Sequence, residues 1–249
     1  MKKIRNNLRK AKILINPLFN NGNIFQKMPY LSITSRIIVS LDQRFVYIRI
    51  PKAANSTVTT LLWSCINNEK LESTKNTQKY KKSFLNAKQL PLKQASMAKK
   101  NFFFFVVVRN PYDRILSAYL NKFSTRKYID RYGEKISKAG DGRLNFTSFC
   151  KYLYKEGLYE NPHWMPQSEY VWPSYDRLDY IGKVESIQKD LERIFTRIFD
   201  DCQSDFTNIY GPTRTHAQAK RDKYYNTETK RIINNLYADD FHRFNYEFE

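Results

Sequence analysis

Residues 102–119 read FFFFVVVRNPYDRILSAY, and this stretch decides the fold. It begins with a continuous apolar run, which is typical of a strand covered on both faces in a parallel sheet. Arg109 comes directly after the run, at the carboxyl end of the predicted strand, where open α/β sheets bind ligands. Asn110 can cap a helix, and Pro111 suits its first position. We therefore expect a strand, a ligand-binding turn and a helix that ends near Phe123.

Residues 45–57, FVYIRIPKAANST, repeat this order of strand, turn and helix. Pro51 ends the strand, and Lys52 places an ammonium group in the turn. The polar residues 55–57 then accompany the free N–H groups of the next helix, a combination that favours an anion site. This is not a P-loop, because the lysine precedes the small polar residues and no Gly-Lys-Ser/Thr ending follows. Taken alone, the turn is equally compatible with an exposed lysine beside a Ser/Thr cap.

The predicted helix after Arg109 carries further polar groups. Ser117 lies seven residues after Asn110, about two helical turns along the same face, and Arg114 is its neighbour three residues earlier. An arginine and a serine that converge from one segment suit a phosphate monoester. The competing interpretation is that Arg109 caps a neighbouring carbonyl and Ser117 only packs.

The remaining pattern alternates strands and helices, so we expect an α/β fold: a single domain with a central parallel β-sheet flanked by helices. A further strand is predicted at 178–184, and helices at 56–67, 147–154, 187–199 and 228–240. Residues 68–100 predict an excursion with some helix. Residues 124–145, which are charged and contain three glycines, predict a flexible loop, and so do residues 203–226.

The composition points to an anionic partner without saying which. The chain has 249 residues, a formal net charge of +19 and 15% aromatic residues, which argues against disorder. A polyanionic cofactor, an acidic polysaccharide, a nucleic acid or an anionic membrane would each suit that charge. The cysteines and histidines are scattered, so we expect buried thiols and no metal site: Cys65, Cys150 and Cys202, with His163, His216 and His242.

Residues 1–40 are basic and irregular, and we expect an arm that precedes a domain at 41–249. Within it, the apolar residues 13–15 are too few for a signal core or a membrane span. The sequence therefore predicts a soluble, cytoplasmic protein of bacterial type. Peripheral contact with the inner face of a membrane stays open, and the oligomeric state is not predicted.

Both quoted stretches resemble the cofactor-binding motifs of sulfotransferases, which use 3′-phosphoadenosine 5′-phosphosulfate (PAPS). IPKAANST resembles the 5′-phosphosulfate loop, and RNPYDRILSAY resembles the 3′-phosphate motif. Further stretches are similar to the carbohydrate branch, sulfotransferase family 2, which includes the chondroitin and dermatan enzymes: SAYLNKF at 117–123, NPHWMPQ at 161–167, DYIGKVE at 179–185 and LYADDFHRFNY at 236–246. The resemblance spans roughly residues 44–248 and implies the P-loop-kinase-like sulfotransferase fold.

The resemblance implies PAPS as the sulfate donor and no metal. It places six residues around the phosphosulfate: Lys52, Ala53, Ala54, Asn55, Ser56 and Thr57. It places Arg109 and Ser117 on the 3′-phosphate, and Lys220 and Arg221 are further candidates for cofactor binding. Thr57 stands where some cytosolic members carry a tryptophan that stacks on adenine, so the adenine contact stays unassigned. Eukaryotic members also carry a Golgi anchor and disulfides, neither of which this sequence predicts.

Sulfuryl transfer needs in-line positioning and removal of the acceptor proton. Lys52 would stabilise charge on the bridging oxygen of the leaving group. His163 is the predicted base, because it lies in the NPHWMPQ stretch between two prolines that stiffen the loop. A structural histidine bonded to the backbone is the competing interpretation. Glu169 and Glu185 are reserve bases.

We expect the acceptor to be a carbohydrate hydroxyl in a polysaccharide, lipopolysaccharide or glycolipid, and an acidic one would suit the charge. Trp164 and Trp172 could stack on a sugar face, although burial is the commoner fate of tryptophan. One alternative is an ATP-dependent, kinase-like phosphotransferase. Another is a non-catalytic binder of acidic glycan or nucleic acid, but no recognised module predicts a specific nucleic-acid partner.

Overall fold

The computed structural model describes residues 16–19, 34–69, 77–171, 176–200, 206 and 215–249. Its centre is a five-stranded sheet in the order β3-β1-β2-β4-β5. The strands are β1 (Ile37–Ser40), β2 (Phe45–Ile48), β3 (Leu85–Asn86), β4 (Phe103–Val108) and β5 (Tyr180–Lys183). β2, β4 and β5 are parallel, whereas β1 pairs antiparallel with both β2 and β3. The expected α/β class is confirmed, with an antiparallel edge added to the parallel strands.

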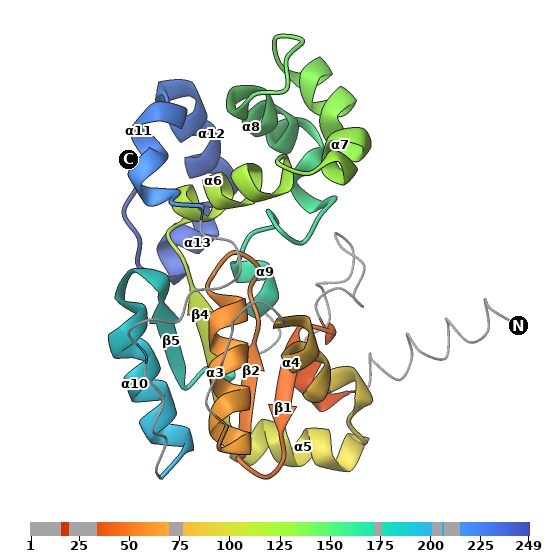
Figure 1. The fold of residues 1–249 in the computed structure, drawn as a ribbon, viewed down its shortest axis with the longest axis vertical. Coiled ribbons are helices and arrows are strands. Elements are labelled where there is room, and N and C mark those ends of the chain that lie inside the picture. Colours follow the sequence, from red (N-terminus) through yellow and green to blue (C-terminus); the bar gives the residue numbers. More distant parts are fainter. Residues whose placement is uncertain (1–15, 20–33, 70–76, 172–175, 201–205, 207–214) are drawn as a thin grey trace, which may run out of the picture.

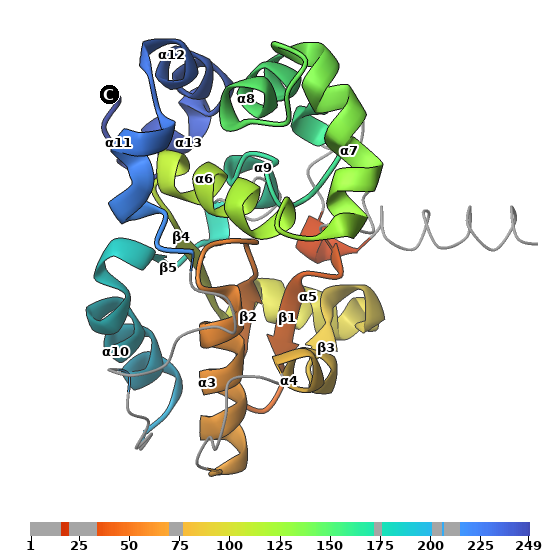
Figure 2. The same cartoon turned by 45° about the horizontal axis from the view of Figure 1, so that its top comes forward.

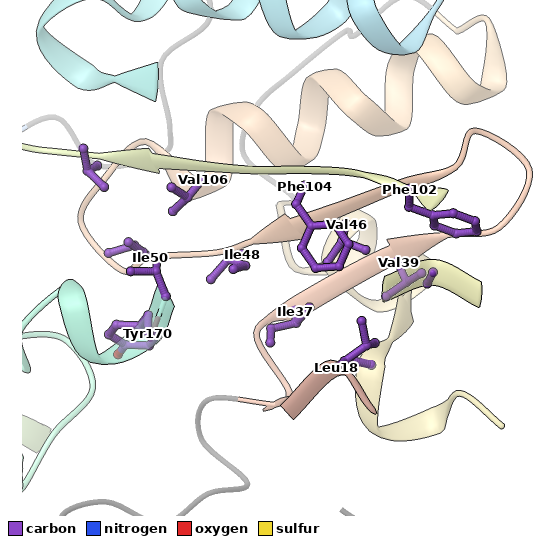
Figure 3. Packing of buried hydrophobic residues seen from close by; sticks show 14 of the residues in the cluster. Leu18, Ile37, Val39, Val46, Ile48, Ile50, Phe102, Phe104, Val106 and Tyr170 are labelled. Atoms are coloured by element: carbon purple, nitrogen blue, oxygen red, sulfur yellow. The ribbon is translucent and has the colours of Figure 1, made fainter. Parts of the chain in front are cut away.

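Two apolar clusters cover the two faces of the sheet, because successive strand residues point to opposite sides. On one face, Phe45, Tyr47 and Phe105 pack against α3 (Asn55–Asn67) and α10 (Ile187–Ile198). On the other face, Val46 and Phe104 belong to a cluster that η1 (Pro17–Phe19), η4 (Ala87–Gln89), α5 (Leu92–Asn101) and α9 (Ser168–Val171) complete (Figure 3). A sheet covered on both faces explains why these strands read as continuous apolar runs.

A third cluster forms a helical lobe beyond the carboxyl ends of the parallel strands (Figures 1 and 2). It is built from α6 (Pro111–Lys122), α7 (Arg126–Ala139), α8 (Phe146–Lys155), α12 (Thr227–Leu236) and α13 (Ala238–Arg243). Shorter elements connect the parts: α4 (Thr77–Ser83), η5 (Gly157–Tyr159), η7 (Val184–Ser186), η8 (Gln218–Lys220) and α11 (Arg221–Tyr224). α6 begins directly after β4 and packs within the lobe against α8, α11 and α12.

Most predicted elements are confirmed, but two predicted loops contain helices, because η8 and α11 lie within residues 203–226 and α7 lies within residues 124–145. Residues 126–139, expected to be a flexible loop, form α7. Its buried residues Tyr132 and Ile136 are four apart and therefore share a face, and this face outweighs the charges and the glycine between them. β1 also begins at Ile37, within the stretch assigned to the basic arm, because it pairs along its whole length with β2.

The cysteines differ from the expectation of three thiols. Cys65 is disulfide-bonded, whereas Cys150 is free and buried. Cys202 itself lies outside the described residues. Spacing along the chain could not predict this bond, because it depends on which segments the fold brings together. Across the described part of the chain, no helix is both long and apolar enough to cross a membrane.

A substitution at Phe105 tests the packing of the core beneath both ligand-binding turns. It is fully buried and stacks on Tyr47 with ring centroids 4.7 Å apart. We expect Phe105→Ala to lower the free energy of unfolding by about 3–5 kcal/mol, because it leaves a cavity under β2 and β4. Leu92→Ala, at a residue that is 46% exposed, should change it by roughly 0.5 kcal/mol or less. Urea unfolding measures both, and equal effects would contradict the packing described.

Candidate active site

The two turns predicted to bind anions meet at the carboxyl ends of two neighbouring parallel strands. β2 and β4 are parallel, with Ile48 paired to Val106, so their carboxyl ends lie side by side. Lys52 follows the first strand and Arg109 follows the second. An Nη of Arg109 donates to the carbonyl oxygen of Lys52 at 3.4 Å. The structure therefore brings together the two cations on which the sequence argument depended.

The backbone of the first turn is strained and is held in place by arginines. Lys52 and Ala54 have φ angles of 68° and 50°, in the left-handed region that costs a non-glycine residue free energy. The Nε of Arg114 donates to the carbonyl oxygen of Pro51 at 3.0 Å, beside the contact from Arg109 to Lys52. α3 starts directly afterwards without a side-chain cap. Its first N–H groups lack intrahelical partners, which is the arrangement that binds anions.

The second turn is fixed by residues from three other segments. Gln167 accepts from the backbone N–H of Arg109 at 2.9 Å and donates to its carbonyl oxygen at 2.7 Å. The buried carboxylate of Asp240 accepts from the backbone N–H groups of Gln167 and Ser168. Glu185 accepts from the backbone N–H of Asn110 at 2.7 Å. Arg109 is therefore held at its main chain, which leaves its guanidinium available for the site.

Asn110 caps α6, as predicted, by accepting from the N–H of Tyr112 at 3.0 Å. The same oxygen accepts from Arg221 at 2.7 Å, and Arg221 also forms a 2.8 Å ion pair with Asp113. Arg221 thus lies beside the second turn, and its contacts there are with protein groups. Lys220 is exposed, and no contact joins it to the other site residues in the described part of the chain.

α6 links the two ends of the site. Ser117, which is buried, accepts a hydrogen bond from the Thr215 hydroxyl at 3.0 Å. One turn later, Asn121 accepts from the Lys52 ammonium at 2.7 Å. One helix therefore carries Asn110 at its first end and reaches Lys52 near its last turn.

The site gathers positive charge that nearby carboxylates offset only in part: Asp113 and Glu185 act on Arg109, and Asp240 acts on Arg114. Burial, and after it the nearby cations Lys122, Arg109, Arg114 and Lys81, together lower the pKa of Lys52 to about 7. Within the described ranges, none of these five residues forms an ion pair. Buried nitrogens also lack hydrogen-bond partners there: the Nε of Arg109 and both Nη atoms of Arg114. Buried cations without partners are costly, so this arrangement favours an anionic ligand.

His163 lies beside this charge in the loop before α9. Asn161 Oδ1 accepts from the backbone N–H of His163 at 3.0 Å and lies 2.8 Å from its Nδ1. An oxygen that already accepts requires a proton on Nδ1, so Nε2 carries the free lone pair. Burial, and after it Lys122, Arg36 and Lys52, together lower the pKa of His163 to about 2. The imidazole is therefore neutral in the ligand-free protein, and a bound anion that offsets these cations would raise its basicity.

The other candidates for acceptor chemistry have structural contacts. Trp164 is fully buried and donates from its indole to the carbonyl of Gly157 at 2.8 Å, so the suggestion that it stacks on a sugar is wrong. Trp172 lies outside the described residues. Glu185 is engaged through both oxygens, by Asn110 and by Tyr246. Glu169 accepts from the hydroxyl of Tyr159 at 2.9 Å.

Sequence reasoning missed four residues of this site. Gln167 stood in a quoted motif without a role, and Arg114 was noted only as a neighbour of Ser117. Asn121 could have been found by adding one helical turn to Ser117. Lys81 comes from α4, in a segment without a sustained pattern. Among the described residues, no cluster of His, Cys, Asp or Glu could hold a metal. A shallow depression between α7, α8 and α12 contains none of the site residues.

The comparison with known proteins agrees with this geometry. A family model described as the sulfotransferase family matches residues 35–247. The chain belongs to this family. The match covers both turns and includes β1, so the sulfotransferase unit starts before residue 41. No solved structure matches this sulfotransferase significantly.

Its relatives include vertebrate carbohydrate sulfotransferases. Carbohydrate sulfotransferase 14 of Mus musculus is 31% identical over 64% of this chain and 45% of its own length. The Danio rerio protein of that name is 30% identical over 67% and 49%. Carbohydrate sulfotransferase 11 of Rattus norvegicus is 25% identical over 84% and 66%. The chain spans about half the length of the first two relatives.

The pKa of Lys52 gives this sulfotransferase a pH-dependent stability. Its folded value of about 7 lies below the ordinary 10.5, so the unfolded chain binds more protons between these values. The burial cost is thus fully present below about pH 7 and disappears as pH rises toward 10. We expect Lys52→Met to raise the melting temperature of the ligand-free protein at pH 6, and the gain to shrink by pH 9.

Thermal unfolding across that pH range checks this prediction. Lys82→Met, which removes an exposed lysine of α4, serves as the control and should produce no such pH-dependent gain. A difference between Lys52→Met and wild type that stays constant with pH would contradict the lowered pKa.

Proposed function

We propose that the protein transfers the sulfuryl group of PAPS to a hydroxyl of a carbohydrate acceptor. The supporting observation is the junction of the two turns, where Lys52, Arg109 and Arg114 meet and form no ion pair within the described residues. Family membership requires a sulfate donor, and PAPS is a polyanion. The unpartnered nitrogens of Arg109 and Arg114 fit such a group, because each is a buried donor that needs an acceptor.

Each turn would hold one end of the donor. Arg109 and Ser117 suit the 3′-phosphate with a forked donor and a hydroxyl. Lys52 and the uncapped start of α3 suit the 5′-phosphosulfate. Ala53 and Ala54 complete the turn, with Ala54 in the left-handed region, and Asn55, Ser56 and Thr57 are the first helical residues. Arg221 acts through Asn110 and Asp113, as a residue that positions the second turn.

When bound, PAPS supplies the activated sulfuryl group, and the residues of this chain supply charge and a base. Lys52 stabilises the negative charge that develops on the bridging oxygen. The free Nε2 of His163 takes the proton of the acceptor hydroxyl. His163 and Lys52 lie close enough for the ammonium to lower the pKa of the imidazole, which supports their action on one reaction.

The proposed acceptor follows from the relatives, which are named carbohydrate sulfotransferases. The cations Arg36 and Lys122 lie near His163 and lower its pKa, so an acidic glycan would suit the acceptor side. Cytoplasmic location stays a prediction, and the disulfide at Cys65 favours an oxidising compartment instead.

Adenosine 3′,5′-bisphosphate (PAP), the product that PAPS leaves, tests donor binding. We expect saturating PAP, about 100 times its Kd, to stabilise the protein by about 2.7 kcal/mol. Arg109→Ala should weaken PAP binding by about 100-fold, because it removes a forked, charged contact. Arg126→Ala, at an exposed arginine of α7, should leave binding unchanged. No thermal shift of the wild type at millimolar PAP would overturn the proposed function.

If His163 is the base, its removal should slow sulfate transfer and leave the affinity for PAP unchanged. We expect His163→Ala to lower kcat for sulfate transfer from PAPS by about 10²–10⁴-fold while PAP affinity stays the same. His242→Ala, at an exposed histidine, is the control. Because the pKa of His163 is about 2 in the free protein, kcat/KM should show no acidic limb near pH 6.5. Full activity of His163→Ala would assign the proton to another group.

A further inference from the structure

α4 turns one lysine toward the site and two lysines away from it. Thr77 and Phe84, seven residues apart, are buried, and Tyr80 packs on Trp63 of α3 with ring centroids 4.6 Å apart. Lys81 shares this inward face by its spacing, whereas Lys79 and Lys82 are exposed. Lys81 is half-buried, and a lysine on the packed face of a short helix calls for a physical reason, because its ammonium loses part of its contact with water.

The ammonium of Lys81 lies at the start of α3. It donates to the hydroxyl of Ser56 at 2.9 Å, and Ser56 is the second residue of that helix. The start of α3 has no side-chain cap and follows Lys52 directly. Lys81 also contributes to the lowered pKa of Lys52, which places both ammonium groups at the same end of the site.

Among the described residues, the charged groups that shift the pKa of Lys81 are all cations. Burial lowers its pKa to about 8, followed by the effects of Arg49, Arg36 and Lys122. In the described ranges it forms no ion pair, and its hydrogen-bond acceptor is a neutral hydroxyl. Lysines with only a supporting role pair with a carboxylate or extend into solvent. Lys81 does neither.

A structural role for Lys81 is not needed to hold α4 in place. The ring contact between Trp63 and Tyr80 already joins α4 to α3, and the buried Phe84 anchors its end in the cluster under the sheet. Moreover, Lys81 brings a cation next to other cations, which weakens the packing that a structural contact would strengthen.

We propose that Lys81 is a further donor-binding residue, which pairs with the 5′-phosphate end of PAPS from outside the two motif turns. This proposal rests on the proposed function. In the ligand-free protein Ser56 holds the ammonium beside the start of α3. The bound donor then receives charge from Lys52 on one side and from Lys81 on the other, and the arginine of the second turn holds its 3′ end.

Two nucleotides serve as probes that distinguish binding at the 3′ end of the donor site from binding at its 5′ end. PAP carries both the 3′- and the 5′-phosphate, and adenosine 3′-monophosphate carries only the first. We expect Lys81→Met to weaken PAP binding by about 10- to 100-fold and to leave adenosine 3′-monophosphate binding within about twofold, because a single charged contact at the 5′ end is lost. Arg109→Ala should weaken the binding of both nucleotides.

Lys82→Met is the matched control, since it removes the same charge from the exposed side of the same helix. It should change neither affinity by more than about twofold, because exposed charge is screened by salt. Lys81→Arg should keep most of the PAP affinity. Calorimetric titration of the full chain measures all of these values, and thermal unfolding of the ligand-free variants accompanies it. Lys81→Met should be as stable as the wild type or more stable.

The outcomes distinguish this inference from the proposed function. If the wild type does not bind PAP, the proposed function fails and Lys81 has no donor to bind. If the wild type binds PAP and Lys81→Met binds it equally well, only the role of Lys81 is overturned. Equal weakening for both nucleotides would also overturn it, as would a Lys81→Met variant that unfolds while Lys82→Met stays folded, because either result would assign Lys81 to the packing of α4.

Discussion

The site depends on two carbonyl oxygens held by two arginines. Arg114 donates to the carbonyl of Pro51, and Arg109 donates to that of Lys52. Both arginines belong to the second motif and both carbonyls to the first, so the turns are joined through the backbone. This contact stabilises the left-handed conformation of Lys52, which would otherwise be unfavourable. The parallel pairing of β2 with β4 makes the contact possible, because it brings both turns to one edge.

A single segment connects the donor side with the acceptor side. In residues 161–167, Asn161 fixes the tautomer of His163, and Gln167 fixes the main chain of Arg109. Asp240 in turn holds the end of this segment through two backbone N–H groups. The motif that sequence reasoning valued for its histidine therefore also supports the cofactor turn. A substitution at Gln167 would disturb Arg109 without touching a ligand.

Sequence reasoning succeeded where a local pattern determines the structure. The apolar run of β4 and the Asn-Pro cap of α6 are local signals, and both were predicted correctly. It failed at α7, where charge and glycine obscured the buried face of Tyr132 and Ile136. The sequence does not show which of Lys81 and Lys82 faces the site. That depends on how α4 packs on α3, where Tyr80 contacts Trp63. Contacts between distant segments are set by tertiary structure, which no single stretch contains.

The charge of the site explains why its geometry is so firmly supported. Lysines and arginines that repel one another and form no ion pair within the described residues lower the stability of the ligand-free protein, and the strained turn adds to this cost. The lowered pKa values of Lys52 and Lys81, about 7 and 8, mean that both lysines can lose part of their charge near neutral pH. An anion that enters the site raises these values again, so binding takes up protons. A bound anion offsets the positive charge that destabilises the ligand-free protein. Such a cluster of cations is therefore typical of a binding site and not of a hydrophobic core.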